Sequence, residues 1–186
     1  ELISTDVYGK TILVYDEQGY GDTIQFARYI EFLKHKGAKV ILECHKSLVR
    51  LLKICKGITE VYSRGELNEK EFKIDYQTAL LSLPLLLYKE ISEIPANVPY
   101  LEADERQDLI WHENYSFKSA YKIGIFWRGK QPVTNLQRAA NLKFFEHIAK
   151  IENVKIFSLQ KEGITEEENE MMAEFGIKDL SSELGD

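Results

Sequence analysis

Short apolar runs alternate with longer amphipathic segments along most of the chain. Apolar, β-rich runs predict buried strands at residues 11–17, 39–44, 60–63 and 75–82. Apolar positions spaced three and four residues apart predict helices at 23–36 and 47–55, with Asp22 as N-cap of the first and Gly37 as its stop. The order β-α-β-α-β-β is typical of a parallel sheet covered by helices.

The same alternation restarts near residue 121, after a polar helix expected at 104–114. The contact face of that helix is expected to contain Leu109, Ile110 and Trp111, and the earlier leucine cluster at 83–87 is expected in the core. The restarted pattern predicts strands at 122–127 and 154–159, a long polar loop at 128–141, and helices at 142–151 and 165–175.

The last helix opens on a capping box formed by Thr165 and Glu168. Two strands are too few for an independent sheet. We therefore expect that they either extend the first sheet or belong to a domain whose remainder is absent from this chain.

Composition places the chain among ordinary globular proteins. It has 186 residues, 44% of them apolar, and a net charge of −6, which argues against a general nucleic-acid binder. No apolar run approaches the roughly 20 residues of a membrane span, so we expect no transmembrane segment. The two cysteines, Cys44 and Cys55, indicate buried thiols in a reducing compartment, and we expect a cytoplasmic protein.

A glycine-rich turn between the first strand and the first helix carries most of the candidate chemistry. Gly19 and Gly21 lie at the carboxyl end of a strand, where open α/β sheets bind ligands. Dinucleotide binding is one alternative, with Glu43 as the ribose-binding acid. It is disfavoured because Ile24 stands where the third glycine belongs and Asp22 would repel a pyrophosphate. A tight turn without any ligand is the other alternative.

A second candidate site follows the predicted strand at 122–127. Residues 124–131 nearly match a P-loop, but Gln131 replaces the hydroxyl that binds magnesium and the intervening side chains are bulky. Arg128, Lys130 and Arg138 could still hold a phosphate or diphosphate, a solvated basic loop being the alternative. The histidines and carboxylates show no metal-ligand spacing, so no metal site is expected.

The segment EQGYGDTIQFARY, residues 17–29, resembles a signature of bacterial tetratricopeptide-repeat-associated glycosyltransferase domains. These domains are related to the heptosyltransferases and have the GT-B fold. Four shorter segments keep the same order as in that family, at residues 81–84, 98–101, 124–127 with Gly129, and 157–161. The resemblance extends from about residue 9 to about residue 184.

The resemblance implies an α/β protein with two Rossmann-like domains that face each other across a cleft. Residues 1–118 would be the acceptor-side domain, and residues 119–186 the first, incomplete part of the donor-side domain. The family transfers a sugar from a nucleotide-sugar donor to an acceptor hydroxyl, here expected with inversion and without metal or cofactor. The acceptor could be a glycan, a lipid-linked molecule or a protein. A non-catalytic sugar- or nucleotide-binding module of the same fold is the alternative.

The resemblance also assigns roles to particular residues. Asp22 would be the catalytic base, and Gln18 and Gln25 would orient substrates by hydrogen bonds. Lys130, Arg138 and Lys161 would stabilise the leaving diphosphate. The remaining residues expected to bind substrate are Gly19, Gly21, Trp127, Arg128 and Gln160.

The chain departs from the family pattern around the donor loop. Arg128 stands where the family usually has a small residue after Trp127. Further along, the family usually has an Asp and an Arg-Ser pair, and in this chain only Arg138 matches them. The family's later strands and its nucleotide-gripping helix would lie beyond Asp186.

Overall fold

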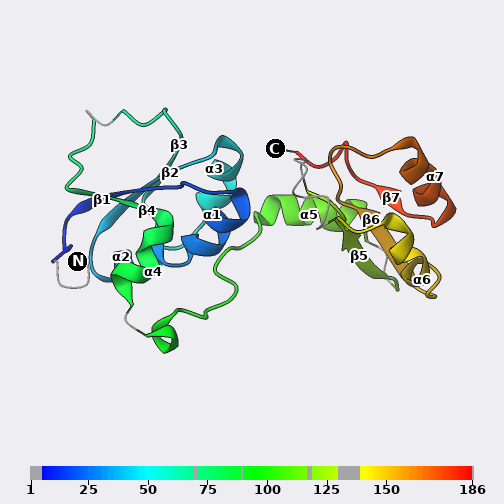
Figure 1. The fold of residues 1–186 in the computed structure, drawn as a ribbon, viewed down its shortest axis with the longest axis horizontal. Helices are drawn as coiled ribbons and strands as arrows, with labels where there is room; N and C mark the ends of the chain where they lie inside the picture. The colour runs from blue at the N-terminus through cyan, green and yellow to red at the C-terminus, as the bar shows by residue number, and fades with distance from the viewer. Residues whose placement is uncertain (1–5, 69–70, 89, 117–118, 130–138, 186) are drawn as a thin grey trace. The chain divides into compact units, whose positions relative to one another are not determined.

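The computed structural model describes residues 6–68, 71–88, 90–116, 119–129 and 139–185. The chain forms two compact units, Glu1–Glu105 and Arg106–Asp186. Each unit has its own parallel sheet with helices packed on it (Figure 1), which confirms the predicted α/β class.

The first unit is built on a four-stranded sheet in the order β3-β2-β1-β4, all pairs parallel. Its strands are β1 (Thr11–Tyr15), β2 (Lys39–Cys44), β3 (Glu60–Ser63) and β4 (Tyr76–Ala79). Leu13 is paired with Ile41 and Val14 with Leu42 across the two central strands. The fourth strand is shorter than predicted, because a 3-10 helix at Leu80–Ser82 follows it directly.

The single helix predicted at 23–36 is wrong, since two helices occupy that segment. They are α1 (Tyr20–Ala27) and α2 (Ile30–His35). The chain breaks at Tyr29, whose buried ring packs against Phe26 and Tyr88. Gly37 follows the end of α2 with φ +82°, a left-handed conformation that glycine adopts readily, so the predicted stop is confirmed.

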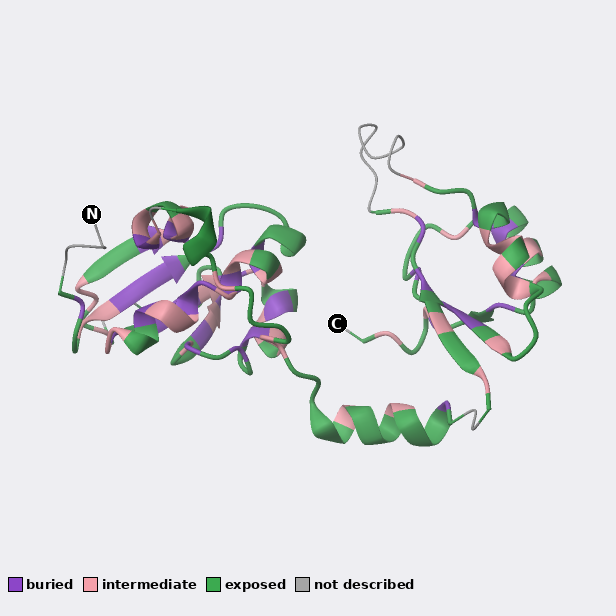
Figure 2. Cartoon of the chain, turned by 90° about the horizontal axis from the view of Figure 1, so that it is seen from below, coloured by how far each residue is buried: buried purple, intermediate pink, exposed green. Residues whose placement is uncertain are grey.

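Two further helices complete the first unit, α3 (Lys46–Leu52) and α4 (Leu83–Leu87), and a 3-10 helix lies at Ile91–Glu93. One face of the sheet and the four α-helices enclose the main core, whose buried residues are coloured purple in Figure 2. Those on the two central strands are Ile12, Val14, Val40, Leu42 and Cys44. The leucine cluster at 83–87 is core only in part, because Leu85 is 82% exposed.

The second unit has a three-stranded parallel sheet in the order β5-β6-β7. Its strands are β5 (Tyr121–Ile125), β6 (Val154–Ser158) and β7 (Lys178–Asp179). These strands therefore do not extend the first sheet, and the third of them is too short and polar to show in the hydrophobic pattern.

The α-helices in the described part of the second unit are α5 (Glu105–Asn114), α6 (Glu146–Ala149) and α7 (Glu166–Glu174). The helix predicted at 142–151 begins instead as a 3-10 helix at Leu142–Phe145. The capping box of Thr165 and Glu168 is confirmed, with each side chain accepting a hydrogen bond from the other residue's backbone N–H.

Each face of the second sheet has a separate apolar cluster. Ile125, Trp127 and Ile156 pack with residues of α6 and α7, including Met172. On the other face Phe157 and Leu180 pack against Tyr115, which directly follows α5. The contact face of α5 is therefore Trp111 with Tyr115, rather than the predicted Leu109 and Ile110, which are 63% and 42% exposed.

A buried carboxylate organises the carboxyl edge of the first sheet. The first residue after β1 is Asp16, the first after β2 is His45, and the first after β3 is Arg64. The Asp16 side chain is 1% exposed and accepts hydrogen bonds from Arg64 Nε at 2.5 Å and from the His45 backbone N–H at 3.0 Å. Thr23 Oγ1 in α1 lies 3.4 Å away. One side chain thus joins three strand ends and a helix.

The replacement Asp16→Ala is expected to lower the free energy of unfolding by about 3 kcal/mol. It removes the partner of the half-exposed Arg64 and of the part-buried His45 N–H, and the loss of several hydrogen bonds to one buried carboxylate is costly. Urea denaturation measures the change. The neighbouring exposed Glu17→Ala is the control and should stay within about 0.5 kcal/mol of the wild type. Equal stability of both variants would contradict this role of Asp16.

Candidate functional site

The turn after β1 opens α1 with an exposed, glycine-flanked segment. Gly19, with φ −74° and ψ 171°, is the N-cap, and its carbonyl accepts the first helical hydrogen bond from the Thr23 N–H. The prediction of Asp22 as N-cap is therefore wrong. Asp22 is the third residue of the helix, and its Oδ2 lies 3.6 Å from the position that a Cβ on Gly19 would take.

All five residues predicted to bind or react in this turn are exposed: Gln18, Gly19, Gly21, Asp22 and Gln25. Within the described part of the chain, the Asp22 carboxylate has neither an ion-pair nor a hydrogen-bond partner. The turn therefore presents an uncompensated carboxylate to solvent at the carboxyl edge of the sheet, where Rossmann-like folds bind their ligands.

Neither glycine of the turn is required by backbone geometry. Gly19 has a negative φ, and Gly21 lies inside α1 with no atom within 4 Å of the position that a Cβ would take. A glycine in a helix is unfavourable by about 0.5–1 kcal/mol relative to alanine. An alanine at residue 21 would therefore be accommodated by the fold itself.

The supporting residues of this edge escaped the sequence analysis. Asp16 could have been noticed as an acid that directly ends an apolar strand, but nothing local links it to Arg64, 48 residues away. The hydrogen bond with Asp16 raises the pKa of Arg64, so this guanidinium stays charged. Glu43 is also engaged, because its Oε1 accepts a hydrogen bond from the Gly65 N–H at 2.9 Å.

The second candidate site lies in the loops that follow β5 and β6. A pocket of about 300 Å³ contains three of the predicted residues, Arg128, Gln160 and Lys161. Its other lining residues are Phe126, Gly129, Glu162 and Gly163. The predicted Lys130 and Arg138 lie outside the described residues.

Hydrogen bonds to α7 fix one wall of this pocket. Arg128 Nη2 forms an ion pair with Glu168 Oε2 at 2.6 Å, and it also donates to the carbonyl of Gly163. The buried indole of Trp127 donates to Glu168 Oε1 at 2.9 Å. Trp127 and Arg128 are thus held by Glu168, and a role for either in binding substrate stays a prediction.

The loop after β6 contributes Gln160 and Lys161 to the lining of this pocket. Gln160 is buried, accepts a hydrogen bond from the Arg128 backbone N–H at 3.2 Å and donates to the Glu162 carbonyl at 3.0 Å. Lys161 is exposed, with its Nζ 3.5 Å from the Gly185 carbonyl. The described lining therefore contains two cations, Arg128, whose charge Glu168 balances, and the exposed Lys161.

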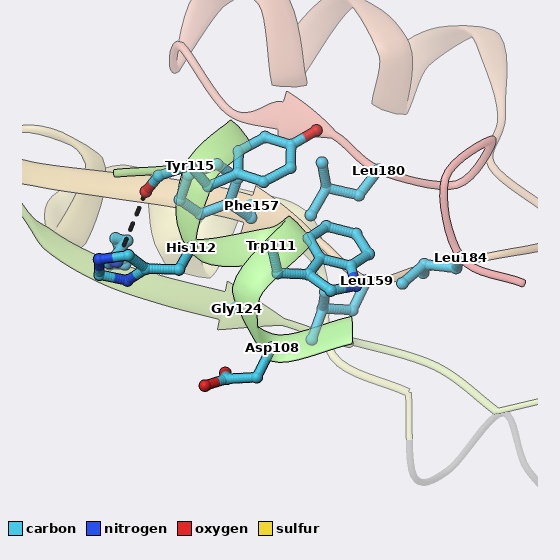
Figure 3. Close-up of a pocket in the computed structure, with 10 residues that line it drawn as sticks. Asp108, Trp111, His112, Tyr115, Gly124, Phe157, Leu159, Leu180 and Leu184 are labelled. Atoms are coloured by element: carbon cyan, nitrogen blue, oxygen red, sulfur yellow. Dashed lines mark hydrogen bonds between the residues drawn. The ribbon is translucent and has the colours of Figure 1, made fainter. Parts of the chain in front are cut away.

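A larger pocket of about 370 Å³ lies against the other face of the second sheet (Figure 3). Trp111 and Tyr115 are stacked with their ring centroids 5.2 Å apart, and Lys122 Nζ lies 3.5 Å from the Tyr115 carbonyl. Its lining is mainly apolar, with Phe157, Leu159, Leu180 and Leu184 among the remaining side chains. None of the predicted site residues lines it.

Among the described residues, no group of three or more His, Cys, Asp or Glu side chains is placed so that it could hold a metal ion. Among the helices of the same residues, none is long and apolar enough to cross a membrane.

No protein-family model and no curated protein matches the sequence. Among solved structures, the chain is similar to the structure of E. coli ADP-heptose LPS heptosyltransferase II, with a TM-score of 0.67 and 15% sequence identity. The match covers 94% of this chain and 73% of that one. At this identity the likeness shows the fold, which is Rossmann-like α/β of the GT-B type.

The contacts of Glu168 predict a pH-dependent contribution to stability. Burial by itself raises the pKa of Glu168, but hydrogen bonds from Arg128, the Thr165 N–H and Trp127 outweigh burial and hold it below its ordinary value of 4.5. A lowered pKa in the folded state stabilises the fold above the unfolded-state pKa, and this stabilisation disappears as the pH falls through the folded-state pKa.

Glu168→Gln should therefore lower the free energy of unfolding by about 2 kcal/mol at pH 7. The difference from the wild type should persist down to about pH 5 and shrink below the ordinary pKa of 4.5, as the wild-type carboxylate takes up its proton. Chemical denaturation at several pH values measures it, with the exposed Glu170→Gln as control. A difference that grows towards acid pH would contradict the assignment.

Proposed function

We propose that this chain belongs to a glycosyltransferase that moves a sugar from a nucleotide-sugar donor to an acceptor hydroxyl, with Asp22 as the base. The observation that carries the proposal is the exposed carboxylate of Asp22 in the first turn of α1, which has no partner among the described residues. It stands beyond the carboxyl end of β1 in a fold shared with a solved heptosyltransferase.

The proposed reaction is a single displacement at the anomeric carbon. The acceptor oxygen attacks this carbon while Asp22 takes the hydroxyl proton, and the bond from the anomeric carbon to the phosphate oxygen breaks. The configuration at the carbon is inverted, and the nucleoside diphosphate leaves with the electron pair. A carboxylate without another partner is available for the proton, as Asp22 is in the described structure.

The pocket after β5 and β6 is the proposed place of the donor diphosphate. Negative charge that develops on the leaving group needs nearby cations or N–H donors. In the described lining, Lys161 is exposed and contributes one positive charge, and the guanidinium of Arg128 forms an ion pair with Glu168. We infer that Lys161 contributes to the stabilisation of the leaving group without a metal ion, together with Lys130 and Arg138 from outside the described residues.

A reducing, cytoplasmic setting is part of the same proposal. Both cysteines are buried thiols without a disulfide, as predicted. Burial raises the pKa of Cys44 to about 12 and that of Cys55 to about 11, so both remain protonated and poorly reactive near neutral pH.

The replacement Asp22→Asn should lower the rate of sugar transfer by about 10²- to 10⁴-fold, because a general base contributes on that scale. Transfer is measured with a panel of UDP-, GDP- and ADP-linked sugars. Glu167→Gln is the matched control, since Glu167 is also an exposed acid in the first turn of a helix. Unchanged turnover in Asp22→Asn would remove Asp22 from the mechanism, and saturable sugar binding without turnover in the wild type would favour a non-catalytic module.

The replacement Gly21→Ala separates function from stability. A methyl group meets nothing at this position and improves helix propensity, so the free energy of unfolding should rise by about 0.5 kcal/mol. If substrate approaches the backbone here, the same methyl group should lower the transfer rate at subsaturating acceptor. Thermal unfolding and initial rates measure the two effects. A variant that is both more stable and fully active would argue against close approach at Gly21.

A further inference from the structure

Tyr20 places an aromatic ring at the entrance of α1. It is the first residue of the helix, and 49% of its surface is exposed. Its neighbours Gly19 and Gly21 have no side chains that could cover the ring. An exposed aromatic residue thus lies between two glycines and two positions before Asp22. Its ring is open to a second molecule.

The ring of Tyr20 is held by His45, which stands at the start of α3. Tyr20 Oη and His45 Nε2 are 3.1 Å apart, and the two ring centroids are 4.6 Å apart with a tilt of 53°. His45 is itself fixed, because its Nδ1 accepts a hydrogen bond from the Ser47 N–H at 3.3 Å and its backbone N–H donates to buried Asp16. The position of the exposed ring is therefore set from the interior of the unit.

These contacts also determine the direction of the hydrogen bond between the two side chains. Since Nδ1 of His45 accepts from Ser47, the neutral imidazole carries its hydrogen on Nε2 and donates it to Tyr20 Oη. The phenolic hydrogen of Tyr20 is then left for a group outside the pair. The turn offers an apolar ring and an O–H donor from Tyr20, and a carboxylate acceptor from Asp22.

A pyranose ring matches this combination. Its C–H face packs on aromatic rings, and its hydroxyl groups both donate and accept hydrogen bonds. A ring that is already fixed loses little conformational freedom when it binds. We propose that Tyr20 binds the acceptor by stacking on its pyranose ring, and that His45 is the positioning residue that holds Tyr20. This inference rests on the proposed transfer at Asp22 and defines the acceptor as a carbohydrate.

Saturation-transfer NMR tests the proposal without turnover. The probes are methyl β-D-glucopyranoside, methyl β-D-galactopyranoside and methyl α-D-mannopyranoside, added to the full protein. At least one should receive saturation from the wild type, and the effect should fall about fivefold in Tyr20→Leu while Tyr20→Trp restores it to within about twofold. Tyr121→Leu is the control, because Tyr121 is an exposed tyrosine on β5 outside the proposed site.

His45→Asn tests the positioning role separately. Asparagine is a favoured N-cap and preserves the start of α3, but its short side chain releases Tyr20. Saturation transfer should fall about threefold, and aromatic ¹³C relaxation should show greater mobility of the Tyr20 ring. An unchanged ring mobility with unchanged saturation transfer would overturn the role of His45.

The proposed stacking on Tyr20 is overturned if no glycoside receives saturation from the wild type. It is also overturned if a glycoside receives as much saturation from Tyr20→Leu as from the wild type. Asp22→Asn distinguishes this failure from failure of the proposed function. Saturation that depends on Tyr20 and survives in a transfer-deficient Asp22→Asn supports both proposals. The same saturation in an Asp22→Asn variant that still transfers sugar supports the stacking on Tyr20 and rejects Asp22 as the base.

Discussion

The carboxylate of Asp16 is the constraint on which the candidate site of the first unit depends. A buried charge is tolerated only when it is paired and hydrogen-bonded, and Asp16 obtains its partners from the ends of two other strands. Arg64 and the backbone of His45 must therefore lie at the same edge as the turn after β1. The starts of α1 and α3 are brought together there, and with them Tyr20 and His45.

The second unit uses the same physical solution at its own sheet edge. Glu168 in α7 is buried and receives hydrogen bonds from Trp127 and Arg128, which follow β5. In both units an arginine that follows a strand is neutralised by a buried acid. With a net charge of −6 there is little general attraction for an anion, so the binding of a diphosphate that we propose would depend on a few local cations such as Lys161.

Features that are unfavourable for folding gather at the turn after β1. Gly21 weakens the first turn of α1, Tyr20 exposes an aromatic surface, and Asp22 has no partner among the described residues. Elsewhere the same unit satisfies its polar groups, since none of its buried side-chain nitrogen or oxygen atoms in the described structure lacks a hydrogen bond. Residues that lower the stability of the fold, surrounded by a rigid network of hydrogen bonds, are the pattern expected of a binding or catalytic site.

The strands were predictable because their signal is local. Residues 39–44 and 60–63 form strands with the predicted bounds, and the capping box at Thr165 and Glu168 was visible from residue types three apart. The prediction failed where packing decides. The helix expected at 23–36 breaks where Tyr29 turns inward, and β7 forms from a polar pair of residues because β6 offers it a partner.

By itself the sequence determined the α/β class, the order of the elements and the exposed segment that contains Asp22, because periodicity and glycine spacing express local backbone preferences. Only the tertiary structure decided that the second series of strands forms its own sheet, that Glu168 forms an ion pair with Arg128, and that Tyr20 is hydrogen-bonded to His45. These contacts join residues 25 to 40 positions apart or depend on strand pairing, so no local pattern encodes them. They follow from the need to pair buried charges and to complete the hydrogen bonds of a sheet.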